Sequence, residues 1–170
     1  MSPGDSLIAA LGLVPHVEGG HFGECWRSAA TLAPGSGNGN GERSLASTIY
    51  YLLSTRAPVG RFHRNTSDIT HFFHSGGPIV YGLISPAGEW REVVLGRDPR
   101  AGQVLAFTCP GGWWKCSHLP AGAEHGLISE VVAPGFDDAD RSIADAALFG
   151  RLFPQHRARW AAYVGGPDGR

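Results

Sequence analysis

The sequence predicts an all-β fold, a barrel or sandwich of short strands with a short helix near each end. Eight short runs of apolar, aromatic and β-branched residues lie between residues 47 and 134. Turn signals rich in Gly and Pro separate these runs, and no helical pattern intervenes between them. Short strands at this spacing are typical of barrels and sandwiches, because a parallel α/β sheet would need a helix after each strand.

The N-terminal part precedes this strand-rich region and is expected to hold three elements. Residues 5–11 favour a short helix, with Ser2 or Asp5 available as its N-cap. Residues 21–30 are predicted as a strand. This strand leads into a Gly-rich segment, residues 33–41, which we expect to be a flexible loop.

The C-terminal part returns to a helical pattern. Residues 142–153 place apolar side chains near one helix face, and Pro154 ends the predicted helix. With 170 residues, the chain is long enough for one well-packed domain and too short for two. We therefore expect a single domain over residues 1–170, with the barrel core at about residues 47–134.

Composition excludes several classes of partner. The formal net charge is −1, so we expect no binding to nucleic acid or to an anionic membrane. No apolar run is long enough to span a bilayer, and the first ten residues lack the features of a secretory signal. The three cysteines form no Cys-x-x-Cys pair, which argues against a disulfide scaffold. The expected location is the cytoplasm.

Two segments resemble the paired motifs of the cupin superfamily. The first cupin motif places two His residues, a Glu and a closing Gly at fixed spacing. The corresponding places in this chain hold His63, Asn65, Ile69 and Gly76. Residues 102–115 resemble the second motif, and the place of its last His holds Lys115.

Three further stretches resemble one branch of this superfamily, the group DUF985 (Cupin_5). They are PHVEGGHFGECWRS at residues 15–28, the His63-Arg64 pair, and VAPGF at residues 132–136. The resemblance implies a double-stranded β-helix, an RmlC-like jelly-roll barrel with a ligand-sized cavity. It also implies a homodimer, in which the strand near residues 22–26 would cover an edge of the neighbouring barrel.

The resemblance bears directly on metal binding. A cupin iron, manganese or nickel site uses imidazoles and one carboxylate. Three of the four ligand places hold Asn65, Ile69 and Lys115, and a single imidazole, His63, does not hold a divalent ion. We therefore expect no metal and no other cofactor. An atypical site that adds His71, which shares the inward parity of His63, is the alternative.

Three residues are candidates for catalysis. The motif places the His63 side chain inside the barrel, and the ordinary pKa of histidine suits proton transfer near neutral pH. The alternative is that His63 is a buried histidine with a structural role. Lys115 is a candidate base, Schiff-base nucleophile or cation. We favour its pairing with Glu24 or Glu130, or binding to the substrate, over covalent catalysis. Glu24 is expected to pair with His63, or else to form a structural ion pair with Arg27.

Five further residues are candidates for ligand binding. Phe73 and Trp113 share the inward parity of the candidate catalytic residues and are expected to form an apolar wall. Polar groups expected around the ligand are His71, Arg64 and Asn65. Glu18, beside two glycines, is expected to be a turn or interface residue.

Three functions compete on these residues. We favour a metal-independent isomerase, epimerase or lyase-like enzyme that moves protons beside a carbonyl group. The second is a non-catalytic module that binds a small molecule, such as an acidic metabolite held by Lys115 and Arg64. The third is a metal-dependent oxygenase with an atypical His site.

Overall fold

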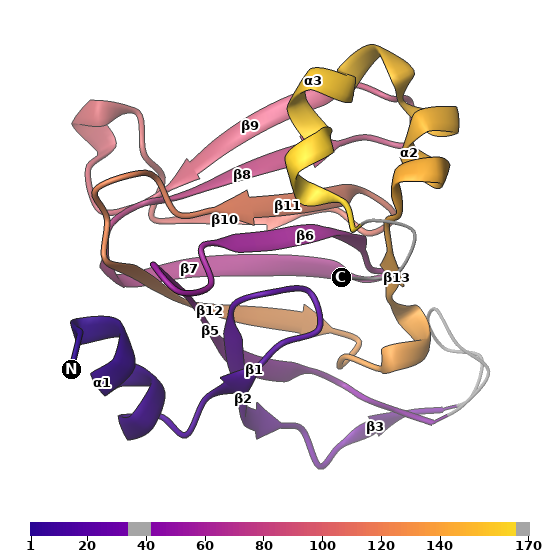
Figure 1. The fold of residues 1–170 in the computed structure, drawn as a ribbon. Coiled ribbons are helices and arrows are strands. Elements are labelled where there is room, and N and C mark those ends of the chain that lie inside the picture. The colour runs from indigo at the N-terminus through magenta and orange to yellow at the C-terminus, as the bar shows by residue number, and fades with distance from the viewer. Residues whose placement is uncertain (34–41, 166–170) are drawn as a thin grey trace.

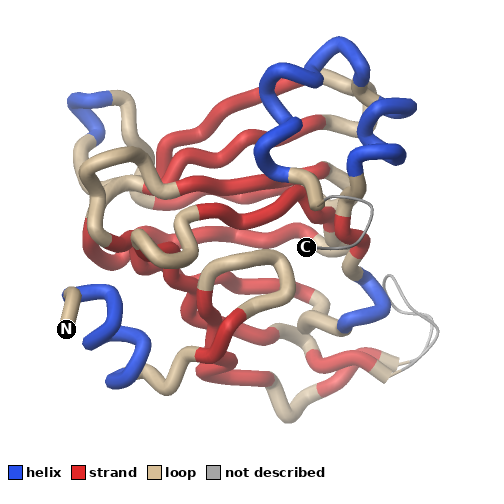
Figure 2. Tube along the Cα trace, in the orientation of Figure 1, coloured by secondary structure: helices blue, strands red, loops and turns tan. Residues whose placement is uncertain are grey.

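The fold consists of two facing antiparallel sheets with short helices packed against their outer faces (Figure 1). The computed structural model describes residues 1–33 and 42–165. Most of the Gly-rich segment predicted to be a loop therefore lies outside the described residues. Strands account for most of the regular structure (Figure 2), which confirms the predicted all-β class.

The larger sheet is built around two long central strands that pair along eight residues. Its six strands, in spatial order, are β1 (Val14–Pro15), β2 (His21–Arg27), β5 (Ser47–Ser54), β12 (His125–Ala133), β7 (Asp68–Gly76) and β10 (Ala106–Cys109). Every neighbouring pair is antiparallel.

The smaller sheet faces the first and is also antiparallel throughout. Its strands, in spatial order, are β13 (Ser142–Ile143), β6 (Val59–Arg64), β11 (Trp114–His118), β8 (Ile79–Ile84) and β9 (Trp90–Leu95). A separate ribbon pairs β3 (Thr31–Leu32) with β4 (Arg43–Ser44). The eight runs predicted from the sequence correspond to β5 to β12 in order.

The N-terminal elements follow their predictions closely. Helix α1 spans Pro3–Ala10, and the Ser2 hydroxyl accepts a hydrogen bond from the Asp5 backbone N–H, as expected of an N-cap. Strand β2 ends at Arg27, three residues before the predicted end. The chain leaves β2 there because the Ser28 N–H bonds the Ala46 carbonyl in the next connection.

The predicted C-terminal helix begins later than expected. Ser142 and Ile143 form β13 and pair with β6, because an open sheet edge offers their backbone groups partners. Asp145 then caps α2 (Ala146–Leu152) by accepting a hydrogen bond from the Leu148 N–H. The remaining helical elements are α3 (Arg157–Trp160), η1 (Pro99–Ala101), η2 (Asp138–Asp140), η3 (Pro154–His156) and η4 (Ala161–Tyr163).

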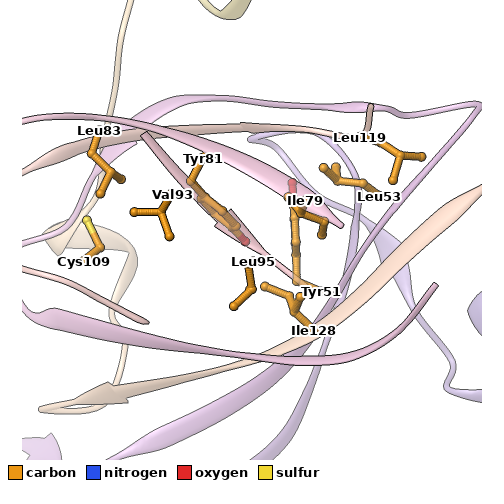
Figure 3. Packing of buried hydrophobic residues seen from close by; sticks show 10 residues of the cluster. All are labelled: Tyr51, Leu53, Ile79, Tyr81, Leu83, Val93, Leu95, Cys109, Leu119 and Ile128. Carbon is orange, nitrogen blue, oxygen red and sulfur yellow. The ribbon is translucent and has the colours of Figure 1, made fainter. Parts of the chain in front are cut away.

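Three apolar clusters hold these layers together. The first fills part of the space between the sheets (Figure 3); we call it the apolar half of the interior. Its buried members are Tyr51, Leu53, Ile79, Tyr81, Leu83, Val93, Leu95, Cys109, Leu119 and Ile128. A second cluster joins the smaller sheet to α2 and α3, and a third joins α1 to the larger sheet. The rest of the interior contains charged and polar side chains beside apolar ones.

No helix in the described ranges is both long and apolar enough to cross a membrane. The homodimer and the cytoplasmic location stay predictions.

Candidate functional site

The polar part of the interior is a cavity of about 70 Å³ between the two sheets. Its charged and polar lining includes Glu18, His63, Asn65, Tyr81, Lys115 and Glu130. The four places of the cupin motifs, His63, Asn65, Ile69 and Lys115, all line this one cavity. We call it the charged half of the interior.

His63 lies on β6 with both ring nitrogens facing oxygen atoms. Its Nδ1 is 2.8 Å from the Arg61 carbonyl oxygen, and its Nε2 is 3.1 Å from Glu18 Oε2. Both oxygens accept hydrogen bonds unless Glu18 is protonated, so a neutral ring satisfies only one of them. A proton held between Nε2 and Glu18 satisfies both. Burial lowers the pKa of His63, and the Glu18 carboxylate offsets only part of this effect.

Glu18 reaches His63 because two glycines allow its loop to lie against β6. Gly19 and Gly20 have φ values of 100° and 68°, and a Cβ on Gly19 would overlap the Val59 carbonyl. The Glu18 carbonyl accepts a hydrogen bond of 2.6 Å from the Arg61 N–H. The loop therefore places a carboxylate, 7% exposed as a residue, directly beside the imidazole.

Two further charged or ionisable groups contact the Glu18 carboxylate. His16 Nδ1 is 3.4 Å from Oε2, and Arg141 Nε is 3.7 Å from Oε1. Burial alone would raise the pKa of Glu18, but the neighbouring His63 and His16 outweigh burial and hold this pKa below its usual value. The Glu18 carboxylate can therefore accept a proton from His63, or stabilise His63 when the ring is protonated.

A second cluster joins β7, β11 and β12. Lys115 Nζ is 2.8 Å from His71 Nε2, which is itself 3.2 Å from Glu130 Oε1. Glu130 Oε2 lies 3.6 Å from Lys115 Nζ. Burial would raise the pKa of Glu130, but Lys115 and His71 lower it well below its usual range. These three groups form one charge-compensated network, in which each side chain contacts the other two.

His71 occupies the back of this network. Its side chain is fully buried, and its ring is stacked on Phe107 at a centroid distance of 4.5 Å. Burial lowers the pKa of His71, and Lys115 lowers it further. His71 therefore contacts Lys115 from behind and does not line the cavity, whereas a position against the ligand was expected.

Three buried polar atoms of residues that line the cavity have no hydrogen-bond partner among the described residues. They are the Tyr81 hydroxyl, Asn65 Oδ1 and His16 Nδ1, and the last of these has only its 3.4 Å contact with Glu18. Burial raises the pKa of Tyr81 well above its ordinary value, so this hydroxyl keeps its proton. Buried polar groups normally have partners, and a bound polar molecule would supply them.

The residues at the four motif places do not match a divalent metal. They offer one imidazole, one amide, one alkyl group and one ammonium, and an ammonium has no lone pair. The imidazole is also engaged by Glu18 and Arg61. In the ranges 1–33 and 42–165, no set of three or more His, Cys, Asp or Glu side chains is arranged to hold an ion.

The expected pairing of Glu24 with His63 is wrong. Glu24 is paired with Arg27, with Arg27 Nη2 2.6 Å from Glu24 Oε2, and its side chain is 42% exposed. It touches only the rim of the cavity. The proposed alternative, a structural pair with Arg27, is what the structure contains, because the bulge between Glu24 and Trp26 lets both side chains lie on the same side of β2.

The expected contact of Arg64 with a ligand is also wrong. Arg64 is exposed, and its guanidinium lies 4.9 Å from the centre of the Trp114 ring, on the face opposite to His63. Successive side chains of a strand alternate between faces, so Arg64 cannot share the cavity with His63. An acidic ligand held by Lys115 and Arg64 is therefore excluded by this geometry.

The two aromatic residues predicted to form the cavity wall lie elsewhere. Phe73 and Trp113 are inward, as their parity predicted, but they pack against the apolar half and do not line the cavity. The aromatic wall consists instead of Phe22, Tyr51, Tyr81 and Phe136. Parity identified the correct face but not the position along the strand.

Two residues of the site were assigned too little weight in the sequence. Glu18 was interpreted as a turn or interface residue, whereas its carboxylate is the partner of His63. Glu130 was named only as one possible partner of Lys115. A signal existed for Glu130, because it is the one charged residue in the apolar run HGLISEVVA. For Glu18, the adjacent Gly-Gly pair indicated a close backbone approach but not its direction.

Comparison with known proteins agrees with this fold. The profile of the family described as Cupin superfamily (DUF985) matches residues 5–144. An uncharacterized protein of Saccharomyces cerevisiae is 39% identical over 146 residues, which cover 80% of this chain and 72% of the yeast protein. The structure of a hypothetical protein from Leishmania major is similar with a TM-score of 0.86 at 32% identity, covering 94% of this chain and 97% of that one.

A protein from Shewanella oneidensis has a TM-score of 0.87 at 32% identity, with 98% of this chain and 99% of that chain covered. The structure of a Bacillus subtilis oxalate decarboxylase mutant is more distant, with a TM-score of 0.53 and 13% identity. The match covers 89% of this chain and 34% of the decarboxylase chain, so it supports the fold alone. The chain therefore belongs to the cupin superfamily, in the group DUF985.

Proposed function

We propose that this cupin binds a small uncharged molecule in the charged half of its interior and moves protons beside a carbonyl group of that molecule. The reaction would be an isomerisation, an epimerisation or a lyase-like step that needs no metal. One observation carries this proposal: His63 lies between two oxygen acceptors in a mostly buried cavity, with Glu18 at 3.1 Å from Nε2.

This arrangement suits general acid–base catalysis. The Arg61 carbonyl fixes the ring orientation through Nδ1, so proton exchange takes place at Nε2. Burial disfavours the imidazolium, while Glu18 stabilises it. A proton held by such opposed effects is easily transferred, and a positioned His contributes about 10²- to 10⁴-fold to a rate.

The charges around the cavity indicate what kind of ligand would bind. Glu130 faces Lys115, and Glu18 faces Arg141, so each carboxylate already has a cationic partner. Among the described residues that line the site, every cation is therefore already paired with a carboxylate, which disfavours an acidic ligand. The Tyr81 hydroxyl and Asn65 Oδ1 instead offer one donor and one acceptor to an uncharged polar molecule. A cavity of about 70 Å³ favours a small one.

Proton exchange in D₂O tests the proposal. The protein would be incubated with a panel of small hydroxyaldehydes and hydroxyketones, and loss of the C–H signal beside the carbonyl followed by ¹H NMR. We expect His63→Gln and Glu18→Gln to slow this exchange at least about 100-fold, because each removes one member of the proton-transfer pair.

His74→Gln is the matched control, since it makes the same substitution on β7 of the facing sheet, at a side chain that is exposed. Its exchange rate should equal that of the wild type. Binding of a panel member without any exchange would contradict the acid–base proposal and favour the non-catalytic binding module. Equal rates in wild type and His63→Gln would contradict the role of His63.

A further inference from the structure

We propose that Lys115 is a reactive amine, which forms an imine with the carbonyl carbon of a small uncharged aldehyde or ketone. The inference rests on the contact between Lys115 Nζ and His71 Nε2, on the burial of both groups, and on the position of Lys115 in the cavity wall. It goes beyond the proposed function, in which Lys115 has no covalent role.

The imidazole of His71 can accept a proton from the Lys115 ammonium. At 2.8 Å, the Lys115 ammonium donates a hydrogen bond to His71 Nε2. Transfer along this bond leaves a neutral amine on Lys115 and an imidazolium on His71, and it removes the charge on Lys115 that otherwise disfavours the imidazolium. Glu130 Oε1, at 3.2 Å, then accepts a hydrogen bond from that imidazolium.

The transfer leaves the net charge of the network unchanged. Before it, the Glu130 carboxylate faces an ammonium at 3.6 Å; after it, the same carboxylate faces an imidazolium. If a buried lysine without such a neighbour lost its proton, the carboxylate beside it would be left without a cation. Here the positive charge only moves from Lys115 to the adjacent ring, so Glu130 keeps a cationic partner. Stacking on Phe107 holds that ring in place.

The covalent step balances without any co-reactant. The Nζ lone pair attacks the carbonyl carbon, and the C=O π pair moves to the oxygen as the C–N bond forms. The two remaining Nζ protons and the carbonyl oxygen then leave as water, and a C=N double bond results. The step is reversible and needs neither oxidant nor reductant.

An imine would also strengthen the chemistry proposed for His63. Once protonated, it draws electrons from the neighbouring carbon more strongly than a carbonyl does, so the C–H there becomes more acidic. His63 and Lys115 pair at the same register on β6 and β11 and line the same cavity. Only this use of the imine depends on the proposed function; its formation does not.

Reductive trapping tests the inference on the full chain. Folded protein would be incubated with glycolaldehyde and cyanoborohydride, and the adducts located by peptide mapping. Lys115 is the one lysine of the sequence, so the amine of Met1 is its competitor and internal reference. We expect Lys115 to be labelled at least about tenfold faster than Met1, because His71 Nε2 lies within hydrogen-bonding distance to take up the Lys115 proton and the cavity wall positions the amine beside a bound carbonyl.

Two variants sharpen the result. His71→Phe keeps a stacked ring but removes the proton acceptor, and we expect labelling of Lys115 to fall at least about tenfold. His74→Gln, on the same strand but exposed, should leave the labelling unchanged. Near-UV circular dichroism checks that each variant is folded.

The wild-type arm decides the inference even if His71→Phe does not fold. Labelling of Met1 with none at Lys115, or labelling of Lys115 only after denaturation, would overturn it and leave Lys115 as a structural counter-charge. Labelling of Lys115 in His63→Gln, which retains the amine, would support the imine even where the proposed proton transfer has failed.

Discussion

The two halves of the barrel interior are built by the same strands and differ by one inward-facing position. On β12, Ile128 belongs to the apolar half, and Glu130, two residues further, belongs to the charged half. On β5, Leu53 is in the apolar cluster and Ile49 lines the cavity, with Tyr51 at the boundary between them. A two-residue step along a strand, about 6.6 Å, therefore separates dry core from candidate site.

This difference shows that the two halves tolerate change in different ways. An apolar side chain contacts several neighbours, and its loss costs contacts but leaves no group unsatisfied. Lys115, His71 and Glu130 are each buried against the other two, so the loss of one leaves a charge or hydrogen-bonding group without its partner. The effects of substitutions on stability should therefore be coupled in the charged half and close to additive in the apolar half.

The largest effect is expected when the network in the charged half is broken. Lys115→Met should lower the free energy of unfolding by about 3–5 kcal/mol, because the Glu130 carboxylate stays buried without its cation. The double variant Lys115→Met/Glu130→Gln should recover part of this loss. Chemical denaturation measures both.

Ile128→Ala provides the comparison from the apolar half, with an expected loss of about 2–5 kcal/mol. Combined with Glu130→Gln, it should show no recovery. If the Lys115→Met single and double variants were equally unstable, the effects in the charged half would not be coupled.

Acidification should separate the two halves next. The pKa of His71 is lowered in the folded state, so below its ordinary value of 6.5 the unfolded chain takes up the proton first and stability declines. The pKa of Glu130 is also lowered, so its contribution is present above 4.5 and is lost as the pH falls further. Both pKa shifts lower the stability as the pH falls, so the melting temperature should fall in two stages.

Thermal melts between about pH 8 and about pH 2 test this, because the range starts above the ordinary pKa of histidine and ends well below that of glutamate. His71→Phe should reduce the stage below 6.5, the ordinary pKa of histidine, and leave the part that comes from His63, whose pKa burial also lowers. Ile128→Ala should lower the whole curve without changing its shape. Two parallel curves for these variants would show that His71 is not linked to stability.

The smallest effect is expected at the rim of the cavity. Glu24→Gln breaks an exposed pair with Arg27, and such pairs contribute less than about 1 kcal/mol. Its effect on proton exchange should also be much smaller than that of Glu18→Gln. A loss of exchange equal to that of Glu18→Gln would restore Glu24 as a partner of the reaction.

The fold was predictable because its signals are local. Strand-forming runs and Gly/Pro turns marked all eight strands from β5 to β12, and inward parity placed His63 and Lys115 in one cavity. The site was less predictable because its partners come from distant parts of the sequence. Pairing of Glu18 with His63 depends on how one loop lies against β6, and no local pattern reports that.

Parity also has a limit that Phe73 illustrates. The register between β7 and β12 shifts between Leu127 and Ile128, beside Phe73, so counting alternate residues does not give depth along the barrel. Phe73 is inward, as predicted, but belongs to the apolar half. The correct face follows from the alternation of the strand, and the neighbours follow only from the assembled sheets.

The loop that carries Glu18 ties the chemistry of this protein to the completion of its fold. His63 lies 45 positions beyond Glu18 in the sequence, and the two meet only when the loop lies against β6. The contacts of Lys115 with His71 and Glu130 likewise need both sheets in place. In a nascent or partly unfolded chain, these side chains are ordinary solvated groups. Any reactivity toward carbonyl metabolites is thus withheld until the barrel has closed around it.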